Sequence, residues 1–204
     1  MFPGNRCDWS GETMEVNKDI KDFLQKHGIR RDIDVCQLSL VKKKLSSVPD
    51  LSRFRFLRKL ELNNNKIREL SCRSLNCCLT ELHLENNNIK SVSGALNHLT
   101  CLRLLFLHNN QIRGLEDTMH ELRRMQQLQN ATFFLNPISH EPGFRHHVIH
   151  CLPSIQVLDR KGKVNRHSDI DFAILKSYLM HLYSLCFHLL LLGDSSSVPL
   201  CCQK

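Results

Sequence analysis

The chain has 204 residues, 42% of them hydrophobic, which is enough for one domain with a buried core. Only 6% of the residues are aromatic, so we expect a core of repeated aliphatic layers rather than one built around a few large rings. The net charge of +8 is compatible with a polyanionic partner such as RNA, but the basic residues are not interleaved with an aromatic RNA-recognition motif, which makes nucleic acid the weaker hypothesis.

The N-terminal region predicts a helical cap. Residues 1–13 contain no apolar run of the kind found in a secretory signal, and we interpret them as the flexible N-terminus of an intracellular protein. The thiols of the ten cysteines are then expected to be reduced. Residues 14–34 form the predicted cap, and Gly28 is its expected helix stop. Its apolar side chains recur at helical spacing, at Val16, Ile20, Phe23 and Leu24.

Five copies of one motif organise residues 35–138. The segment LRKLELNNNKIREL at 57–70 recurs as LTELHLENNNIKSV at 79–92 and as LRLLFLHNNQIRGL at 102–115. One more degenerate copy precedes these three and another follows, and the five starting positions are separated by 22, 22, 23 and 26 residues. A regular period of this length predicts a solenoid in which each copy forms one layer.

Each copy predicts a short parallel strand followed by a turn. Side chains alternate between the two faces of a strand, so in LEL at 60–62 the leucines are expected in the core and Glu61 on the concave surface. Cys36 and Cys101, each beside a first aliphatic position, are expected as small core residues. Asparagine recurs where the chain leaves the strand, and its amide can pair with both backbone donors and acceptors. A structural ladder is therefore expected at Asn65, Asn87, Asn110 and Asn136, while the first copy has Lys43 at this place.

The motif resembles the leucine-rich repeat family, and in particular its intracellular 22-residue class. A protein phosphatase regulator, a spliceosomal A-prime protein and an axonemal dynein light chain belong to this class. The resemblance covers residues 35–164 and implies an α/β fold, an open solenoid with five short parallel strands on its concave face and a cap at each end. It also implies a non-catalytic scaffold within a larger intracellular complex, ciliary, axonemal or phosphatase-regulating, but it does not identify the partner.

The C-terminal part divides into a cap and a tail. Residues 139–164 resemble the cap that closes this repeat class, and residues 165–204 form an apolar tail whose role the sequence leaves open. Between residues 174 and 192 the tail is apolar nearly all round, but this length is marginal for a membrane span, which needs about 20 apolar residues. A membrane anchor, a helix packed on the cap, a dimer contact and a disordered ending are the alternatives.

The strand positions that alternate with the leucines supply the candidate partner-binding surface. Along the repeats this surface begins polar, passes an acidic step and becomes apolar. Phe106 and Phe134 are its expected anchors, because aromatic side chains on a rigid surface are typical of a binding hot spot. The alternative is that the C-terminal cap covers Phe134 and that Phe106 is a scattered surface hydrophobe. The candidate residues are Glu61, Glu81, His83, Glu85, Leu104, Phe106, His108 and Phe134.

No motif indicates catalysis, a cofactor or a metal site. His140-Glu141 lacks the second histidine of a zinc protease motif, and Cys77-Cys78 lacks the spacing of a redox pair. Potential zinc ligands also gather at His146, His147, His150 and Cys151. Because no second ligand cluster accompanies them, we expect no metal. We therefore expect a cytoplasmic or nuclear protein, with the cilium as an alternative, that is not an enzyme, has no small-molecule substrate and binds a protein on its concave face.

Overall fold

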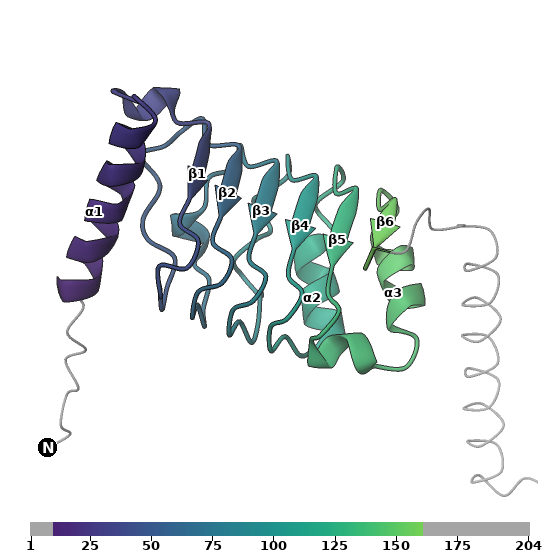
Figure 1. Cartoon of the computed structure of the whole chain (residues 1–204). Helices are drawn as coiled ribbons and strands as arrows, with labels where there is room; N and C mark the ends of the chain where they lie inside the picture. The colour runs from purple at the N-terminus through teal and green to yellow at the C-terminus, as the bar shows by residue number, and fades with distance from the viewer. Residues whose placement is uncertain (1–9, 161–204) are drawn as a thin grey trace, which may run out of the picture. The chain divides into compact units, whose positions relative to one another are not determined.

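The structure is a computed structural model, and it describes residues 10–160. Short parallel strands lie side by side in sequence order and form one open six-stranded sheet (Figure 1). The strands are β1 (Gln37–Ser39), β2 (Lys59–Glu61), β3 (Glu81–His83), β4 (Leu104–Phe106), β5 (Asn130–Thr132) and β6 (Val157–Leu158). The predicted α/β solenoid with parallel strands is confirmed.

Helical elements lie at both ends of the sheet and in the connections between strands. The first helix, α1 (Ser10–Lys26), stands beside β1, and the long connection between β4 and β5 contains α2 (Leu115–Leu122), which lies behind these strands in Figure 1. The remaining elements are η1 (Asp32–Asp34), η2 (Cys72–Ser74), η3 (Pro137–His140) and α3 (Phe144–Cys151).

The core consists of stacked aliphatic layers. The strand register aligns the middle residues of β1 to β5 with the second residue of β6, so that one buried column runs through Leu38, Leu60, Leu82, Leu105, Ala131 and Leu158. Each repeat adds further aliphatic side chains to its own layer. The second repeat, for example, contributes Leu57, Leu60, Leu62 and Ile67, all fully buried. Since burying one such side chain stabilises a fold by about 1.5–3 kcal/mol, the leucine spacing accounts for the architecture.

Buried asparagines connect each repeat to the one before it. The Nδ2 group of Asn87 donates to the carbonyl oxygens of Leu62 and Leu84, both at 3.0 Å, and its Oδ1 accepts from the Ile67 N–H at 3.0 Å. Asn65, Asn110 and Asn136 make the corresponding hydrogen bonds to their own repeat and to the preceding one.

A second set of asparagines lies one residue earlier, where the backbone is left-handed. Asn64, Asn86 and Asn109 have φ values of 59°, 58° and 55°. Asn86 donates to Asn64 Oδ1 at 3.1 Å, and Asn109 donates to Asn86 Oδ1 at 2.7 Å. The first and fifth repeats have Lys42 and Leu135 at this position, also with positive φ. Asparagine tolerates this conformation better than leucine does.

Each end of the solenoid is covered. At the N-terminal end, Val16 and Ile20 of α1 are buried in the core, and Lys43 Nζ lies 2.6 Å from Asp19 Oδ1. At the C-terminal end, Phe144 of α3 packs edge-on against Phe133, with ring centroids 5.9 Å apart. The apolar layers are thus closed off from water at both ends.

A carboxylate joins two repeats away from the sheet. Glu121 of α2 is 4% exposed, and its oxygens accept from the N–H groups of Gly94, Leu96 and Asn97 at 3.0, 2.7 and 2.8 Å. Burial alone would raise the pKa of Glu121, but these backbone donors together hold the pKa below its usual value. The carboxylate therefore anchors α2 to the connection that precedes it.

The sheet has one strand more than the five expected. The sixth strand, β6, lies within the predicted cap, where the amides of Gln156 and Val157 donate to the carbonyl of Gln129 at 2.7 and 3.0 Å. This strand has only two residues, and its apolar pattern is too short to be recognised by periodicity. The first helix also begins earlier than expected, at Ser10, inside the segment that was predicted to be flexible.

The expectation that Cys36 and Cys101 fill the core is wrong. Both side chains are exposed. Cys36 follows the first aliphatic residue of its repeat and occupies the position taken in the next repeat by Arg58, an exposed residue just before the strand. Cys101 lies at a different position, directly before the buried Leu102. The six cysteines within the described part of the chain have free thiols.

The apolar tail lies outside the described residues, and so does the segment 174–192 within it. Among residues 10–160, no helix has the length and apolar character needed to cross a membrane.

Candidate functional site

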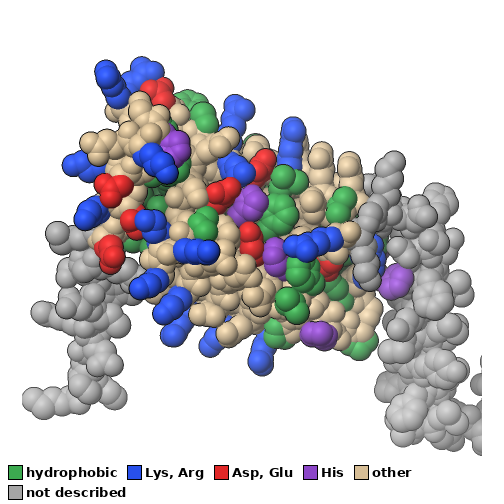
Figure 2. Space-filling view, in the orientation of Figure 1, with side chains coloured by type: hydrophobic (Ala, Val, Ile, Leu, Met, Phe, Trp, Pro, Cys, Tyr) green, Lys and Arg blue, Asp and Glu red, His purple; other side chains and the backbone are tan. Residues whose placement is uncertain are grey.

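The candidate surface is the concave face of β2 to β5. The parallel register places Lys59, Glu81 and Leu104 in one row, and Glu61, His83 and Phe106 in a second. These side chains are half-buried, and each is flanked by its neighbours in the row. A third row follows the strand ends and contains Asn63, Glu85, His108 and Phe134. Figure 2 shows acidic, histidine and hydrophobic side chains close together on this part of the molecule.

The side chains that β2 and β3 contribute to these rows form a charged network. Lys59 Nζ lies 3.1 Å from Glu61 Oε1 and 3.6 Å from Glu81 Oε2, and the hydrogen bond to Glu61 raises the pKa of Lys59. Burial alone would raise the pKa of Glu61, but hydrogen bonds from Ser39 and Lys59 hold it below its usual value. Three carboxylates, at Glu61, Glu81 and Glu85, share this region with one lysine. The charged part of the concave face is therefore acidic, although the whole chain is basic.

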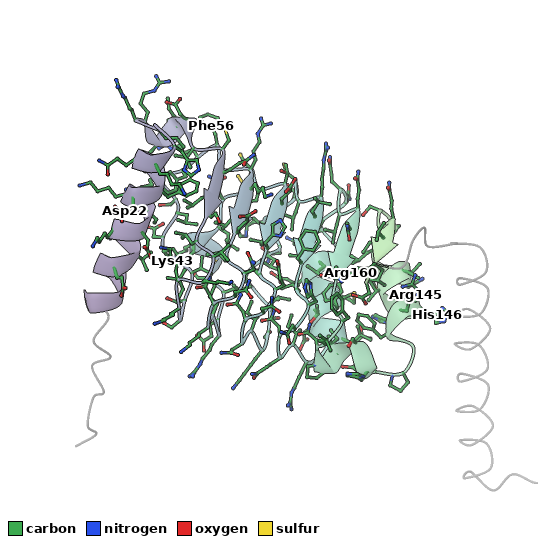
Figure 3. The ribbon with its side chains drawn as sticks, viewed as in Figure 1. Asp22, Lys43, Phe56, Arg145, His146 and Arg160 are labelled. Atoms are coloured by element: carbon green, nitrogen blue, oxygen red, sulfur yellow. The ribbon has the colours of Figure 1, made fainter. Side chains whose placement is uncertain are left out.

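Two stacked pairs of rings form the aromatic end of the surface. His83 stacks on Phe106 with ring centroids 4.5 Å apart, and His108 stacks on Phe134 at 4.3 Å. The guanidinium carbon of Arg160 lies over Phe134, 5.1 Å from its centroid, a cation–π arrangement. Figure 3 labels Arg160 beside the last strands. These contacts hold two phenylalanine rings half-buried, one at the end of β4 and one two residues after β5, so that binding would cost them little conformational entropy.

His108 is held in its neutral form by its surroundings. Its Nδ1 lies 2.9 Å from the hydroxyl oxygen of Thr132, which is itself buried. Burial lowers the pKa of His108; the carboxylates of Glu85 and Asp159 oppose this, while Arg160 lowers the pKa further. The net shift is downward, so at neutral pH the stacked imidazole is uncharged.

Three polar atoms on the concave face have no hydrogen-bond partner within residues 10–160. They are His83 Nε2, Glu85 Oε2 and Asn130 Oδ1, and each is shielded from solvent. His83 lies 3.7 Å from Glu85 and 3.9 Å from Glu81, which is too far for hydrogen bonds. Shielded polar atoms without partners cost free energy.

The structure brings all eight predicted residues onto one face but arranges the aromatic ones differently from the sequence expectation. Leu104 and Phe106 belong to β4, whereas Phe134 lies two residues beyond the end of β5. Each phenylalanine packs on a histidine instead of forming part of one apolar cluster. The sequence did not indicate Arg160 as part of this surface, because its position over Phe134 depends on the short strand β6. The neighbouring Leu135 is 63% exposed.

The other histidines and cysteines form no recognisable reactive centre within residues 10–160. His147 Nε2 lies 3.5 Å from the thiol of Cys151 and 3.5 Å from Glu116 Oε1, and His150 is exposed. Burial raises the pKa of Cys151, and that of Cys78 as well, which disfavours the reactive thiolate. No group of three His, Cys, Asp or Glu side chains in the described part of the chain is placed to hold a metal ion.

Comparisons with known proteins give a consistent assignment. The chain is 34% identical over 101 residues to the probable U2 small nuclear ribonucleoprotein A' of Caenorhabditis elegans, covering 49% of this chain and 40% of that protein. It is 33% identical over 122 residues to U2 small nuclear ribonucleoprotein A' of Saccharomyces cerevisiae, covering 60% of this chain and 42% of that protein. The chain thus spans about two fifths of the length of these relatives.

A solved structure has the same fold. The crystal structure of the Drosophila melanogaster SNF/U2A' complex aligns with a TM-score of 0.59 at 22% identity, covering 69% of this chain and 87% of the matched one. A family model described as leucine-rich repeat matches residues 34–174. The predicted resemblance to the spliceosomal A-prime type is confirmed, and the chain belongs to the leucine-rich repeat family.

Proposed function

We propose that the chain is a non-catalytic scaffold that holds a protein partner on its concave face. The observation that carries this proposal is the two histidine–phenylalanine stacks. They hold Phe106 on β4 and Phe134 just after β5 half-buried beside an acidic network. Aromatic side chains that are already ordered are efficient anchors for a protein interface.

The charged side chains of the concave face indicate which kinds of side chain the partner would place against it. Glu81 and Glu85 lie on either side of His83, the residue that stacks on Phe106. A lysine or arginine next to an apolar side chain would pair with Glu81, whose side chain is 34% exposed, and pack against the Phe106 ring at the same time. We therefore expect a protein segment, such as an amphipathic helix, that combines apolar and basic side chains.

The relatives support a role within a larger assembly. Two of them are named as small nuclear ribonucleoproteins, and the Drosophila relative was solved as an SNF/U2A' complex. By this resemblance we place the protein in the nucleus or cytoplasm, in an assembly that contains protein and, as the alternative, RNA. The comparisons give no support to a ciliary location, and a membrane contact through residues 174–192 likewise has no support.

An affinity pull-down with the full chain tests the proposal. The variant Phe106→Glu/Phe134→Glu places charges at both rings. The control is Phe56→Glu, because Phe56 is a surface phenylalanine, 54% exposed, that precedes β2 and lies outside the concave face. Circular dichroism and thermal unfolding check that each variant is folded. Lysates are compared with and without nuclease.

We expect a protein that survives nuclease, binds the wild type and the Phe56 control, and is lost from the double variant. A folded double variant that keeps every partner of the wild type would overturn the concave scaffold. Loss of all partners with nuclease alone would replace it with the RNA-associated alternative.

A further inference from the structure

A row of cations lies along the edge of the solenoid where the strands end, separate from the concave face. We define this basic edge by its six exposed residues, Lys42, Lys44, Lys66, Arg68, Lys90 and Arg113. Figure 2 shows a row of Lys and Arg side chains along the lower edge of the repeats, and in Figure 3 long side chains tipped with nitrogen project from the same edge.

The repeats place these cations in register. Backbone hydrogen bonds run from Arg68 N–H to Ser46 O at 3.3 Å and from Arg113 N–H to Lys90 O at 3.2 Å, so equivalent turn residues lie side by side. Neighbouring parallel segments are about 5 Å apart, and Arg68, Lys90 and Arg113 therefore follow one another at roughly this interval. The result is a line of positive charge, not a scattered surface.

These six cations lack the carboxylate partners that other cations of the chain have. Lys43 pairs with Asp19, Lys59 with Glu61 and Arg31 with Asp34, but within residues 10–160 no ion pair involves the basic edge. Like charges on neighbouring segments repel and reduce stability. A polyanion along the edge would remove this repulsion and release counterions.

The other side chains of the edge are amides. The six cations occupy three equivalent positions of the repeat, each of which forms one column along the edge. In the second, third and fourth repeats, the other residues in these columns are Asn64, Asn86, Asn88, Asn109 and Gln111. Amide side chains can donate hydrogen bonds to phosphate and sugar oxygens, and they are common at nucleic-acid contacts. No carboxylate and no large apolar side chain occupies these columns in the three repeats, which leaves nothing to insert into a lipid surface.

We propose that the basic edge binds the phosphodiester backbone of a nucleic acid strand. The line of cations matches one strand of linear polyanion, and the neighbouring amides add uncharged donors. Since no aromatic ring lies among these columns to stack on bases, recognition is expected to be independent of sequence and strongly dependent on salt.

Fluorescence anisotropy with the full chain tests this. The probes are labelled oligo(U) RNA of about 20 nucleotides, DNA of the same length and an RNA duplex, each long enough to exceed the ~16-nucleotide upper site size of a single-strand-binding fold. The variant Lys66→Gln/Arg68→Gln/Lys90→Gln/Arg113→Gln removes four charges from the edge. The matched control, Arg55→Gln/Arg73→Gln/Arg103→Gln/Arg124→Gln, removes four exposed charges elsewhere.

We expect the edge variant to bind a nucleic acid probe at least about tenfold more weakly than the wild type does, and the control to stay close to the wild type. The salt dependence of the edge variant should also be flatter, by roughly 0.7 in the log–log slope for every phosphate that the substituted side chains no longer neutralise. Binding to single strand or duplex shows which form of backbone the edge takes, and either supports the proposal.

Equal losses of affinity in the two variants, or equally effective competition by polyglutamate, would overturn the proposal. The Phe106→Glu/Phe134→Glu variant should bind the probes normally, so this test and that of the concave scaffold can fail separately.

Discussion

The imidazole of His108 lies on the ring of Phe134 with the two planes only 13° from parallel. Arg160 lies over the same phenylalanine. The aromatic end of the concave face is thus held together by residues from the fourth repeat, the fifth repeat and the C-terminal cap.

Replacing Arg160 by glutamine should raise the pKa of His108. Burial is the main cause that lowers this pKa, and the positive charge of Arg160 lowers it further. Removing the guanidinium removes its repulsion of a protonated His108 and also exposes the stacked rings to water. A titration of the histidine ring signals by NMR measures the change, with Arg124→Gln as the control, because Arg124 is an exposed cation that does not contribute to this pKa. A His108 pKa that stays the same or falls would contradict this account of the stack.

Replacing Glu121 by glutamine should destabilise the fold by about 2 kcal/mol at neutral pH, because a neutral amide oxygen accepts the three backbone N–H groups less strongly. The folded-state pKa of Glu121 is depressed, so its stabilisation is present above the unfolded pKa of ~4.3 and is lost as the pH falls through the folded value. Urea unfolding should therefore show a difference from the wild type that shrinks as the pH falls below the unfolded pKa of ~4.3. Glu116→Gln, on the same helix but 84% exposed, should change stability little.

Replacing Asn87 by alanine should cost about 3 kcal/mol or more. It leaves the Ile67 N–H without its partner and removes one donor each from the carbonyls of Leu62 and Leu84, all in a buried layer. Asn88→Ala is the control, because Asn88 is only half-buried and should change stability by less than about 0.5 kcal/mol. Similar unfolding midpoints for the two variants would show that the buried amide links are unimportant.

Replacing Leu135 by asparagine should stabilise the protein by about 1 kcal/mol, which raises the melting temperature by roughly 2–4 °C. Leu135 has a φ of 57° and is 63% exposed, so leucine bears the cost of a left-handed backbone without gaining burial. Asn109 occupies the same position one repeat earlier and shows that an amide is suited to it. Leu135→Ala serves as the control, since alanine keeps the backbone cost, and the prediction is wrong if alanine stabilises as much as asparagine.

The sequence was sufficient to predict the layers of the fold. Leu60, Leu82 and Leu105 recur at a spacing that only one strand register satisfies, and the same spacing placed Glu61, His83 and Phe106 on the opposite face. This works because a solenoid repeats one local structure, so that each copy supports the interpretation of the others.

Contacts between dissimilar segments were not predictable in this way. Arg160 reaches Phe134 through a strand of two residues that no periodicity reveals. Glu121 looks like one more surface acid on an amphipathic helix until the amides of Leu96 and Asn97 are seen to face it. The alignment of the basic edge likewise depends on the turns being in register, whereas along the sequence its cations are dispersed.

The direction of the buried asparagine links has a consequence for synthesis on the ribosome. Each amide belongs to the later of the two repeats that it joins, so the Leu62 carbonyl and the Ile67 N–H of the second repeat wait for Asn87 of the third. A repeat that has just emerged is therefore incomplete until another 20 to 25 residues have followed it. At ~5–20 residues per second this delay is on the order of one to five seconds for each layer. The nascent solenoid would thus always carry one unfinished layer at its growing end, where a chaperone could bind.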